Sequence, residues 1–252
     1  MCLVVFAWQA HPDYRLILAA NRDEYHQRPA QNAHWWPDVP AMLAGRDLQA
    51  NGTWLGISKK GRAGVITNYR EHEIRNPAKL SRGALITDFI NNDNTPRDFA
   101  EAVSGEDYAG FNLLLIDGKE LTYVSNRGDH LSVLEPGLYG LGNASLDTPW
   151  PKLERSKRAF SESLGADNIN SDNLLNLLND RRQAEPHEVD SAGLPQELAQ
   201  ALSAPFIVMP HYGTRCSSVI LWSHDGTIEF SERRFDPSGA VSGEARFQFQ
   251  CD

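Results

Sequence analysis

Short runs of apolar and β-branched residues, separated by turn residues, dominate both ends of the chain. Four of these runs lie early in the sequence, at 2–9, 15–20, 53–58 and 62–68. Three later pairs, 111–116 with 121–125, 131–134 with 138–141 and 217–223 with 227–232, flank turns that contain Asp-Gly or Pro-Gly. Apolar runs joined by such turns are typical of β-hairpins. The pattern therefore predicts mainly antiparallel strands.

The middle of the chain has helical spacing instead. The expected helices lie at 79–91, 96–104, 149–164 and 171–179, and Thr148 is the expected N-cap of the third, with Pro149 in its first turn. Residues 180–205 lack a clear period and are expected to form a surface excursion with one short helix at 196–202. Strands, then helices, then strands indicate an α+β fold. We expect an αββα sandwich, in which two mainly antiparallel sheets stack face to face and helices cover the outside.

Length and composition narrow the class of protein. A chain of 252 residues with 41% hydrophobic residues can bury a large core, and we expect a single domain, 1–252. The net charge of -9 leaves no broad cationic face, so nucleic acid is not an expected partner. Three cysteines are too few for a disulfide framework, which favours a cytoplasmic location. The apolar run at 3–8 ends at a polar segment and is too short for a signal peptide or a membrane span.

Cys2 is the first candidate for chemistry. Removal of Met1 would leave Cys2 with both a thiol and a free α-amino group. An α-amine of pKa about 7.7–8.0 can accept the proton of a thiol of pKa about 8.5, which activates an N-terminal nucleophile. The alternative is a buried, inert cysteine in a strand.

Four consecutive polar residues, Asn21, Arg22, Asp23 and Glu24, end the apolar run that begins near residue 15. Side chains alternate across a strand, so Asn21 and Asp23 share one face while Arg22 and Glu24 share the other. We expect Asn21 and Asp23 to face Cys2. Arg22 would then support the thiolate or pair with Glu24. The alternative is an exposed, salt-bridged strand end.

Several motifs in one order resemble the NRDE family, also called transport and Golgi organisation protein 2. They are Met1-Cys2, 16–24, 52–58, 67–69, 110–112, 126–128, 142–144 with 148–150, 212–215 and 232–233. The resemblance spans nearly the whole chain and implies a fold like that of N-terminal-nucleophile (Ntn) hydrolases. It also links the chain to haem trafficking and to lipid or acyl-thioester metabolism.

A more distant resemblance, to penicillin V acylases and bile-salt hydrolases, implies individual catalytic roles. Cys2 matches the nucleophile and Asn68 an oxyanion-hole asparagine. Asn21, Asp23, Asn143 and Arg215 match further residues of the catalytic site. Ala20 stands where those enzymes carry an arginine, so Arg22 or Arg215 has to replace it. Substrate contacts are expected from Arg22, Glu24, Trp54 and Tyr69.

Two classes of function follow from these residues. In the first, the protein is a hydrolase without a required cofactor, and Cys2 attacks an amide or acyl (thio)ester bond of a small metabolite. In the second, it is a non-catalytic carrier of haem or an acyl ligand, with Trp35, Trp36, Trp54 and Trp150 lining an apolar cavity. Eight histidines without metal-ligand spacing make a zinc site improbable. A pure interaction scaffold is a third class, and nothing in the pattern specifies an oligomeric state.

Overall fold

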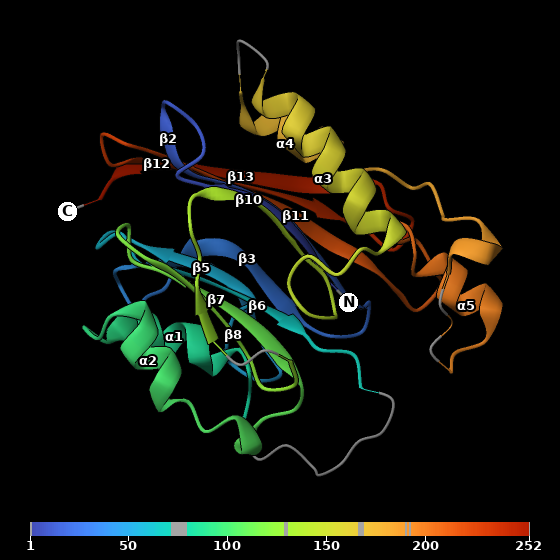
Figure 1. Cartoon of the computed structure of the whole chain (residues 1–252), viewed down its shortest axis with the longest axis horizontal. Coiled ribbons are helices and arrows are strands. Elements are labelled where there is room, and N and C mark those ends of the chain that lie inside the picture. Colours follow the sequence, from blue (N-terminus) through green and yellow to red (C-terminus); the bar gives the residue numbers. More distant parts are fainter. Residues whose placement is uncertain are drawn as a thin grey trace.

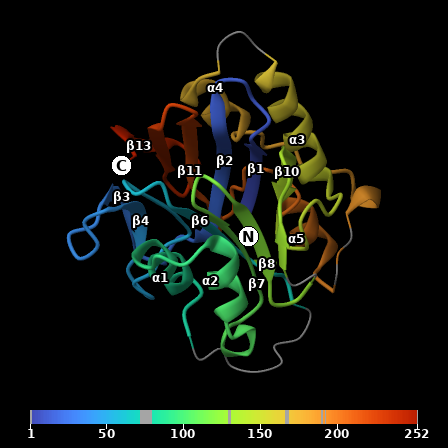
Figure 2. The same ribbon diagram turned by 60° about the vertical axis from the view of Figure 1, so that its left-hand side comes forward.

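Two stacked antiparallel sheets form the centre of the protein (Figure 1). The computed structural model describes residues 2–71, 80–128, 131–165, 169–189, 191 and 193–251. The first sheet has the order β10-β1-β2-β11-β12-β13, and Figure 2 shows β1, β2, β10 and β11 side by side. Its strands are β1 (Cys2–Trp8), β2 (Tyr14–Tyr25), β10 (Gly137–Leu141), β11 (Tyr212–Ser223), β12 (Thr227–Phe235) and β13 (Val241–Gln250).

The second sheet follows chain order, β3-β4-β5-β6-β7-β8-β9. Its strands are β3 (Ala30–Trp35), β4 (Met42–Asp47), β5 (Leu55–Ser58), β6 (Ala63–Asn68), β7 (Phe111–Ile116), β8 (Leu121–Ser125) and β9 (Leu131–Val133). Apolar side chains from both sheets, among them Phe6, Leu18, Leu114 and Trp222, fill the layer between them. This layer is the main core of the molecule.

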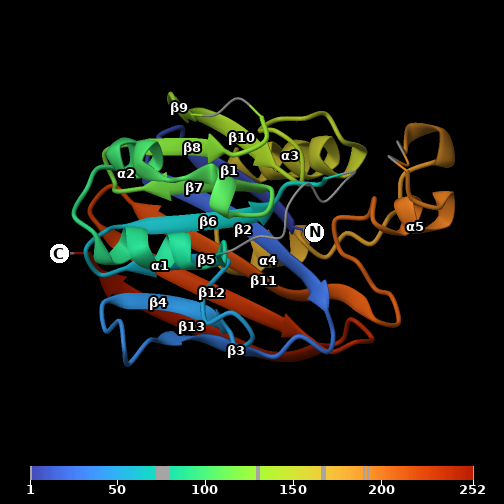
Figure 3. The same cartoon turned by 90° about the horizontal axis from the view of Figure 1, so that it is seen from below.

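Helices cover the two outer faces, and the predicted αββα sandwich is confirmed (Figure 1). The outer face of the second sheet packs against α1 (Ala84–Asn91) and α2 (Pro96–Ala102). The outer face of the first sheet packs against α3 (Pro151–Leu164) and α4 (Ser171–Leu177). A short helix, α5 (Gln196–Ala201), projects at the end opposite the C-terminus (Figure 3). In the described segments, no helix is long and apolar enough to cross a membrane.

The hydrophobic pattern of the sequence does not predict three of the strands, β3, β4 and β13. β3 and β4 are short and partly polar. β4 also contains Gly45, where a Cβ would lie 2.4 Å from the Trp54 ring, so the packing of Trp54 requires glycine at this position. In β13 alternate residues are half-buried, and two of them, Phe247 and Phe249, pack against the core. β2 also continues through the polar residues to Tyr25, whereas the pattern predicts a strand that ends near residue 20.

The expected hairpin between 131–134 and 138–141 is wrong. β9 pairs with β8 in one sheet and β10 pairs with β1 in the other, so the chain changes sheets at this turn. Pro-Gly chemistry shows where a chain bends, but it carries no information on which sheet receives the next strand. The hairpins across 58–61, 117–118 and 225–226 are confirmed.

The third helix begins two residues later than predicted. Its N-cap is Trp150, and Pro151 is its first residue. A residue that precedes proline is driven out of the helical region, and Trp150 is extended at φ -76 and ψ 142. The Thr148 hydroxyl donates to Ser145 O at 2.8 Å instead of capping the helix. The first predicted helix starts at Ala84, and Lys79 lies outside the described residues.

Candidate functional site

The Cys2 thiol lines a cavity between the two sheets. Val4, Phe6 and Trp8 of β1 face the core between the sheets, and alternation places Cys2 on the same side. The cavity has a volume of about 500 Å³. The Cys2 backbone N–H donates to Asn143 Oδ1 at 3.3 Å, and burial raises the pKa of the Cys2 thiol. Burial therefore favours the neutral form of this thiol.

Of the pair predicted to face Cys2, Asp23 lines the cavity with Cys2, whereas the prediction for Asn21 is wrong. Arg22 lies opposite Cys2 in the β1–β2 ladder, and both Arg22 and Glu24 line the cavity. Asn21 does not line it: the amide donates to two backbone carbonyls behind the sheet, at 2.9 Å each, and accepts from the Ser217 hydroxyl. Asn21 thus ties the first sheet to the helical layer.

Asp23 occupies the boundary between the cavity and the helical layer. Its carboxylate accepts from the Thr214 hydroxyl at 2.6 Å, and the residue also lines the cavity. Burial raises the pKa of this carboxyl. Lys152 of α3 is only 2% exposed, and its Nζ donates to Leu202 O at 3.2 Å. Burial lowers the pKa of Lys152, and attraction to Asp23 opposes this shift.

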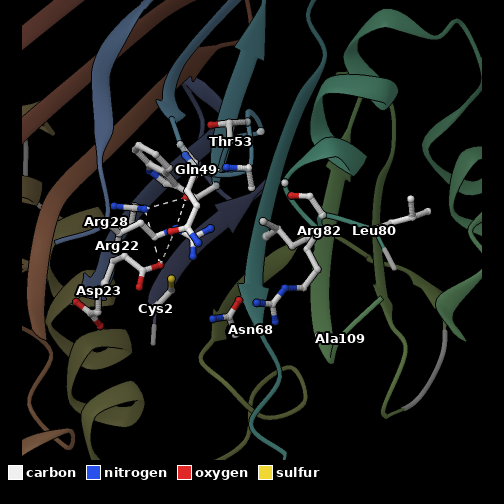
Figure 4. Close-up of a pocket in the computed structure, with 18 residues that line it drawn as sticks. Cys2, Arg22, Asp23, Arg28, Gln49, Thr53, Asn68, Leu80, Arg82 and Ala109 are labelled. Carbon is white, nitrogen blue, oxygen red and sulfur yellow. Dashed lines mark hydrogen bonds and ion pairs between the residues drawn. The ribbon is translucent and has the colours of Figure 1, made fainter. Parts of the chain in front are cut away.

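One wall of the cavity is a network of alternating charges (Figure 4). Arg22 lies 3.4 Å from Asp47 and 3.8 Å from Glu24. Arg28 lies 2.5 Å from Asp47 and 3.6 Å from Glu24. Burial opposes ionisation of Asp47, yet hydrogen bonds from Arg28 and two backbone N–H groups hold its pKa below the usual range. The Arg22 guanidinium also stacks on Trp54, 4.2 Å from the ring centroid.

The opposite wall carries amide and guanidinium donors. Asn68 ends β6 with an exposed side chain in the cavity, and Arg82 lies beside it (Figure 4). Asn143 Nδ2 donates to Asn68 O at 2.7 Å, so Asn143 links this wall to the Cys2 backbone. Arg82 donates to Gly110 O at 2.8 Å, and no ion pair joins it to a carboxylate within the described ranges. Burial lowers the pKa of Arg82 from its usual range.

In addition to Asn21 and Asn143, two more predicted site residues, Arg215 and Tyr69, do not line this cavity. Arg215 donates to three backbone carbonyls, of Tyr25, His26 and Arg28, and lines a neighbouring cavity. Tyr69 is partly buried beyond the end of β6, and its backbone N–H donates to Gly110 O at 2.9 Å. Their assigned roles stay predictions, and neither side chain lines the cavity at Cys2.

The predicted apolar cavity of four tryptophans is wrong. Only Trp54 among them lines the Cys2 cavity. Trp36 is 1% exposed in the core beneath α1, and Trp35 packs edge-on against Phe249. Trp150 lines a small separate cavity beside Lys152. In the part of the chain that the structure describes, no three His, Cys, Asp or Glu side chains gather as a metal site.

Sequence reasoning misses Arg28, Asp47, Arg82 and Lys152. Asp47 ends β4, a strand that the pattern does not reveal, and Arg82 precedes α1 in an irregular segment. Among these four, only Lys152 could have been found from the helical spacing of the sequence. It lies four and eight residues before Ser156 and Phe160, both buried on the inner face of α3. A lysine on that face marks a buried charge.

Comparisons with known proteins agree with this architecture. The profile of the family described as Transport and Golgi organisation 2 matches residues 1–237. The chain is 37% identical to the Transport and Golgi organization protein 2 homolog of Bos taurus, over 99% of this chain and 100% of that protein. It is also 37% identical to the Homo sapiens homolog, over 92% of each protein.

Two solved structures resemble the fold at low sequence identity. One is the conjugated bile acid hydrolase of Clostridium perfringens, with a TM-score of 0.54 and 9% identity over 98% of this chain and 92% of that one. The other is the N-acylethanolamine-hydrolyzing acid amidase ortholog of Caenorhabditis elegans, with a TM-score of 0.52 and 11% identity over 87% and 92%. These likenesses show the Ntn-hydrolase-like fold that the sequence predicts. The profile match and the bovine relative show, in addition, that the chain belongs to the Transport and Golgi organisation 2 family.

Proposed function

We propose that the protein is an Ntn-type cysteine hydrolase that cleaves an amide or acyl (thio)ester bond of a small metabolite. The observation that carries this proposal is the position of Cys2 at the start of β1, with its thiol in a cavity and its backbone nitrogen held by Asn143. Nucleophile and base would belong to one residue once Met1 is removed. The likeness of the fold to two hydrolases is consistent with this function.

The reaction would proceed through an acyl-enzyme. The neutral Cys2 α-amine takes the thiol proton, and the thiolate forms a bond to the substrate carbonyl carbon. The Asn68 amide faces the cavity and donates to the oxyanion. Collapse of the tetrahedral intermediate breaks the bond to the leaving group, which receives the proton from the Cys2 ammonium. Water then hydrolyses the thioester and restores the thiol.

Ala20 stands at the position where the resembling acylases carry an arginine, and in this proposal Arg22 supplies that positive charge near Cys2. Arg22 is Cys2's neighbour across the β1–β2 ladder and lines the same cavity, whereas Arg215 does not. Burial raises the pKa of Cys2, and the Arg22 charge lowers it, which favours the thiolate. Arg22 is therefore the side chain that supports the nucleophile in this proposal.

The lining of the cavity favours a polar substrate over a flat apolar ligand. Three arginines and three carboxylates line it: Arg22, Arg28, Arg82, Asp23, Glu24 and Asp47. A haem carrier would need apolar walls for the macrocycle, and the four tryptophans do not supply them. A non-catalytic carrier of an acyl ligand is the outcome that the test has to separate from the hydrolase.

Intact mass and thiol labelling test the proposal together. The mature protein should begin at Cys2, and iodoacetamide should label Cys2 faster than Cys216, whose pKa burial raises well above the usual value. A Cys2→Ala variant should lose turnover of an acyl-thioester and amide panel, while Cys216→Ala retains it. Asn68→Ala should keep the labelling but lower turnover about 100- to 1000-fold. Retained Met1, or binding of panel members without turnover, contradicts the hydrolase and supports the carrier.

A further inference from the structure

A second cavity, with a volume of about 150 Å³, adjoins the Cys2 cavity. Arg22 and Trp54 line both, so the Arg22–Trp54 stack forms a shared wall. The remaining lining comes from β3, from the start of β11, from the end of β12 and from the start of β13. Cavities that hold whole metabolites measure about 300–1,000 Å³, so this one has room for a single small group.

The charge of this cavity is positive in an acidic protein. Its titratable lining comprises Arg22, Arg215, Arg234, Glu232 and Cys216, in a chain of net charge -9. Glu232 is 2% exposed, and its Oε1 accepts from the Ala33 backbone N–H at 2.9 Å. Burial raises the pKa of Glu232, which weakens the only negative charge among these residues. Arg22 already has carboxylate partners, so the excess belongs to Arg215 and Arg234.

Arg234 is the cation of this cavity whose guanidinium donors are unused within the described residues. Ile228 and Phe230 of β12 face the core between the sheets, and alternation places Glu232 and Arg234 on that side. Within the described residues, Arg234 makes no hydrogen bond and no ion pair within 4 Å, although its charge attracts the Glu232 carboxylate, and its Nε is buried without an acceptor. A buried guanidinium donor without an acceptor is costly. A ligand oxygen would remove that cost.

The neighbouring strand is shaped around this guanidinium. Arg234 pairs with Gly243 of β13, beside a register shift in the ladder. A Cβ on Gly243 would lie 2.1 Å from Arg234 Nη2, so only glycine leaves the guanidinium its present place. Arg215 is fixed as well, since its Nη1 donates to three backbone carbonyls. Arg215 is therefore held in place before any ligand arrives, and Gly243 leaves the space that the Arg234 guanidinium occupies.

We propose that this cavity is an anion subsite of the Cys2 cavity, and that it takes a carboxylate or phosphate group of the same small molecule. Arg234 supplies the unused donors, and guanidinium groups bind both oxyanions through paired N–H donors. This inference rests on the proposed function, and it narrows the substrate class to acyl or amide compounds that bear an oxyanion. The shared Arg22–Trp54 wall defines the path between the two groups.

The test compares charged and neutral alkylating probes of Cys2. N-chloroacetyl derivatives of glycine, γ-aminobutyrate and aminohexanoate would each be compared with their methyl esters. At the spacer that reaches Arg234, the acid should label Cys2 about tenfold faster than its ester, or more, which is the worth of a charge-assisted hydrogen bond. Because the labelling rate of each acid is divided by that of its own ester, the intrinsic reactivity of the thiol cancels from the ratio. It therefore reports on the subsite even if Cys2 never turns over a substrate.

Variants and competition then locate the effect. Arg234→Gln should abolish the acid preference, and Gly243→Ala should reduce it by displacing the guanidinium while keeping the charge. Arg246→Gln, on β13 like Gly243, should leave the acid preference unchanged, because Arg246 is half-exposed and pairs with Asp172 and Glu244. Inorganic phosphate, against sodium chloride of equal ionic strength, should slow only the acid if the subsite accepts phosphate. Acid preference that phosphate leaves intact but Arg234→Gln removes identifies a carboxylate site.

Two results would overturn the subsite. One is equal labelling by acid and ester at every spacer length in the wild-type protein. The other is an acid preference of the same size in wild type, Arg234→Gln and Gly243→Ala, which would assign it to Arg22 or Arg82 in the main cavity.

Discussion

Arg22 is the residue that most closely connects the fold to the proposed chemistry. It is 6% exposed and lies between Cys2 on β1 and Cys216 on β11 in the strand ladders. Its charge is held by Asp47, Glu24 and the face of Trp54. A buried guanidinium with this many partners stays in one orientation, so its field acts on Cys2 in a constant geometry.

Replacement of Arg22 by Gln tests this field. The Arg22 charge lowers the pKa of Cys2 against the effect of burial, so its loss should raise that pKa further. Alkylation of Cys2 should become slower at neutral pH, and its rise with pH should move to higher pH. The free energy of unfolding should fall by about 1–3 kcal/mol because Asp47 and Glu24 lose a partner.

Arg28→Gln is the matched control for Arg22→Gln. Arg28 binds the same two carboxylates, so its loss should also lower stability. Arg22→Lys should restore part of the alkylation rate because it keeps the charge. Identical pH profiles for Arg22→Gln and Arg28→Gln would show that Arg22 acts on the wall of the cavity and not on the thiol.

Among the elements, those with a local signal could be predicted from the sequence and those that depend on partners could not. The hairpin across 117–118 has its own turn chemistry, and Gly118 adopts φ 81 as such a turn requires. β13 has few apolar residues and exists because β12 offers it an edge. The separation of β9 from β10 depends on which sheet has room, and a turn sequence does not encode this.

Helix α2 offers an element with a purely local start. The Thr95 hydroxyl accepts from the Asp98 N–H at 3.1 Å, and Pro96 is the first helical residue. Thr95→Ala should lower the free energy of unfolding by about 1 kcal/mol, measured by urea denaturation. Thr95→Ser keeps the hydroxyl and should stay near wild type. Equal loss in both variants would assign the effect to the threonine methyl group instead of the cap.

Across the whole molecule, the sequence predicts one half of the candidate site better than the other. Arg22, Asp23 and Glu24 follow an apolar strand, so their closeness to Cys2 follows from the pairing of neighbouring strands. Asp47 and Arg82 come from elements that no local pattern places beside Cys2. Asn21 lies on the face opposite to the predicted one, because alternation defines two sets of side chains and only packing against α4 decides which set is outside.

Asp180 anchors the long excursion after α4 to the rest of the molecule. It lies 2.9 Å from Arg155 Nε and 2.8 Å from Arg182 Nη2. Burial opposes ionisation, but hydrogen bonds from Arg182 and Arg155 lower the pKa of Asp180 to about 2. An unfolded aspartate has a pKa of about 3.9, so the stabilisation is complete above that value and is lost as the pH falls towards 2.

Asp180→Asn should therefore lower the free energy of unfolding at pH 7 by on the order of 1–2 kcal/mol. The difference from wild type should shrink as the pH falls from about 4 to about 2, because wild-type Asp180 also loses its charge there. Urea denaturation across this range measures it. A difference that stays constant down to pH 2 would mean that the amide disrupts packing and that ionisation contributes nothing.

The places of the three thiols decide how oxidation would damage the molecule. Cys2 and Cys216 sit on strands separated by β2, about 10 Å apart, whereas a disulfide needs Cα atoms within about 7 Å. Cys251 lies at the far end of the β12–β13 ladder from the Cys216 pairing. A sulfenic acid that a peroxide forms at Cys2 therefore has no second thiol of the same chain within reach to form a disulfide. Repair has to come from outside, through a mixed disulfide with a small thiol such as glutathione, before irreversible oxidation sets in.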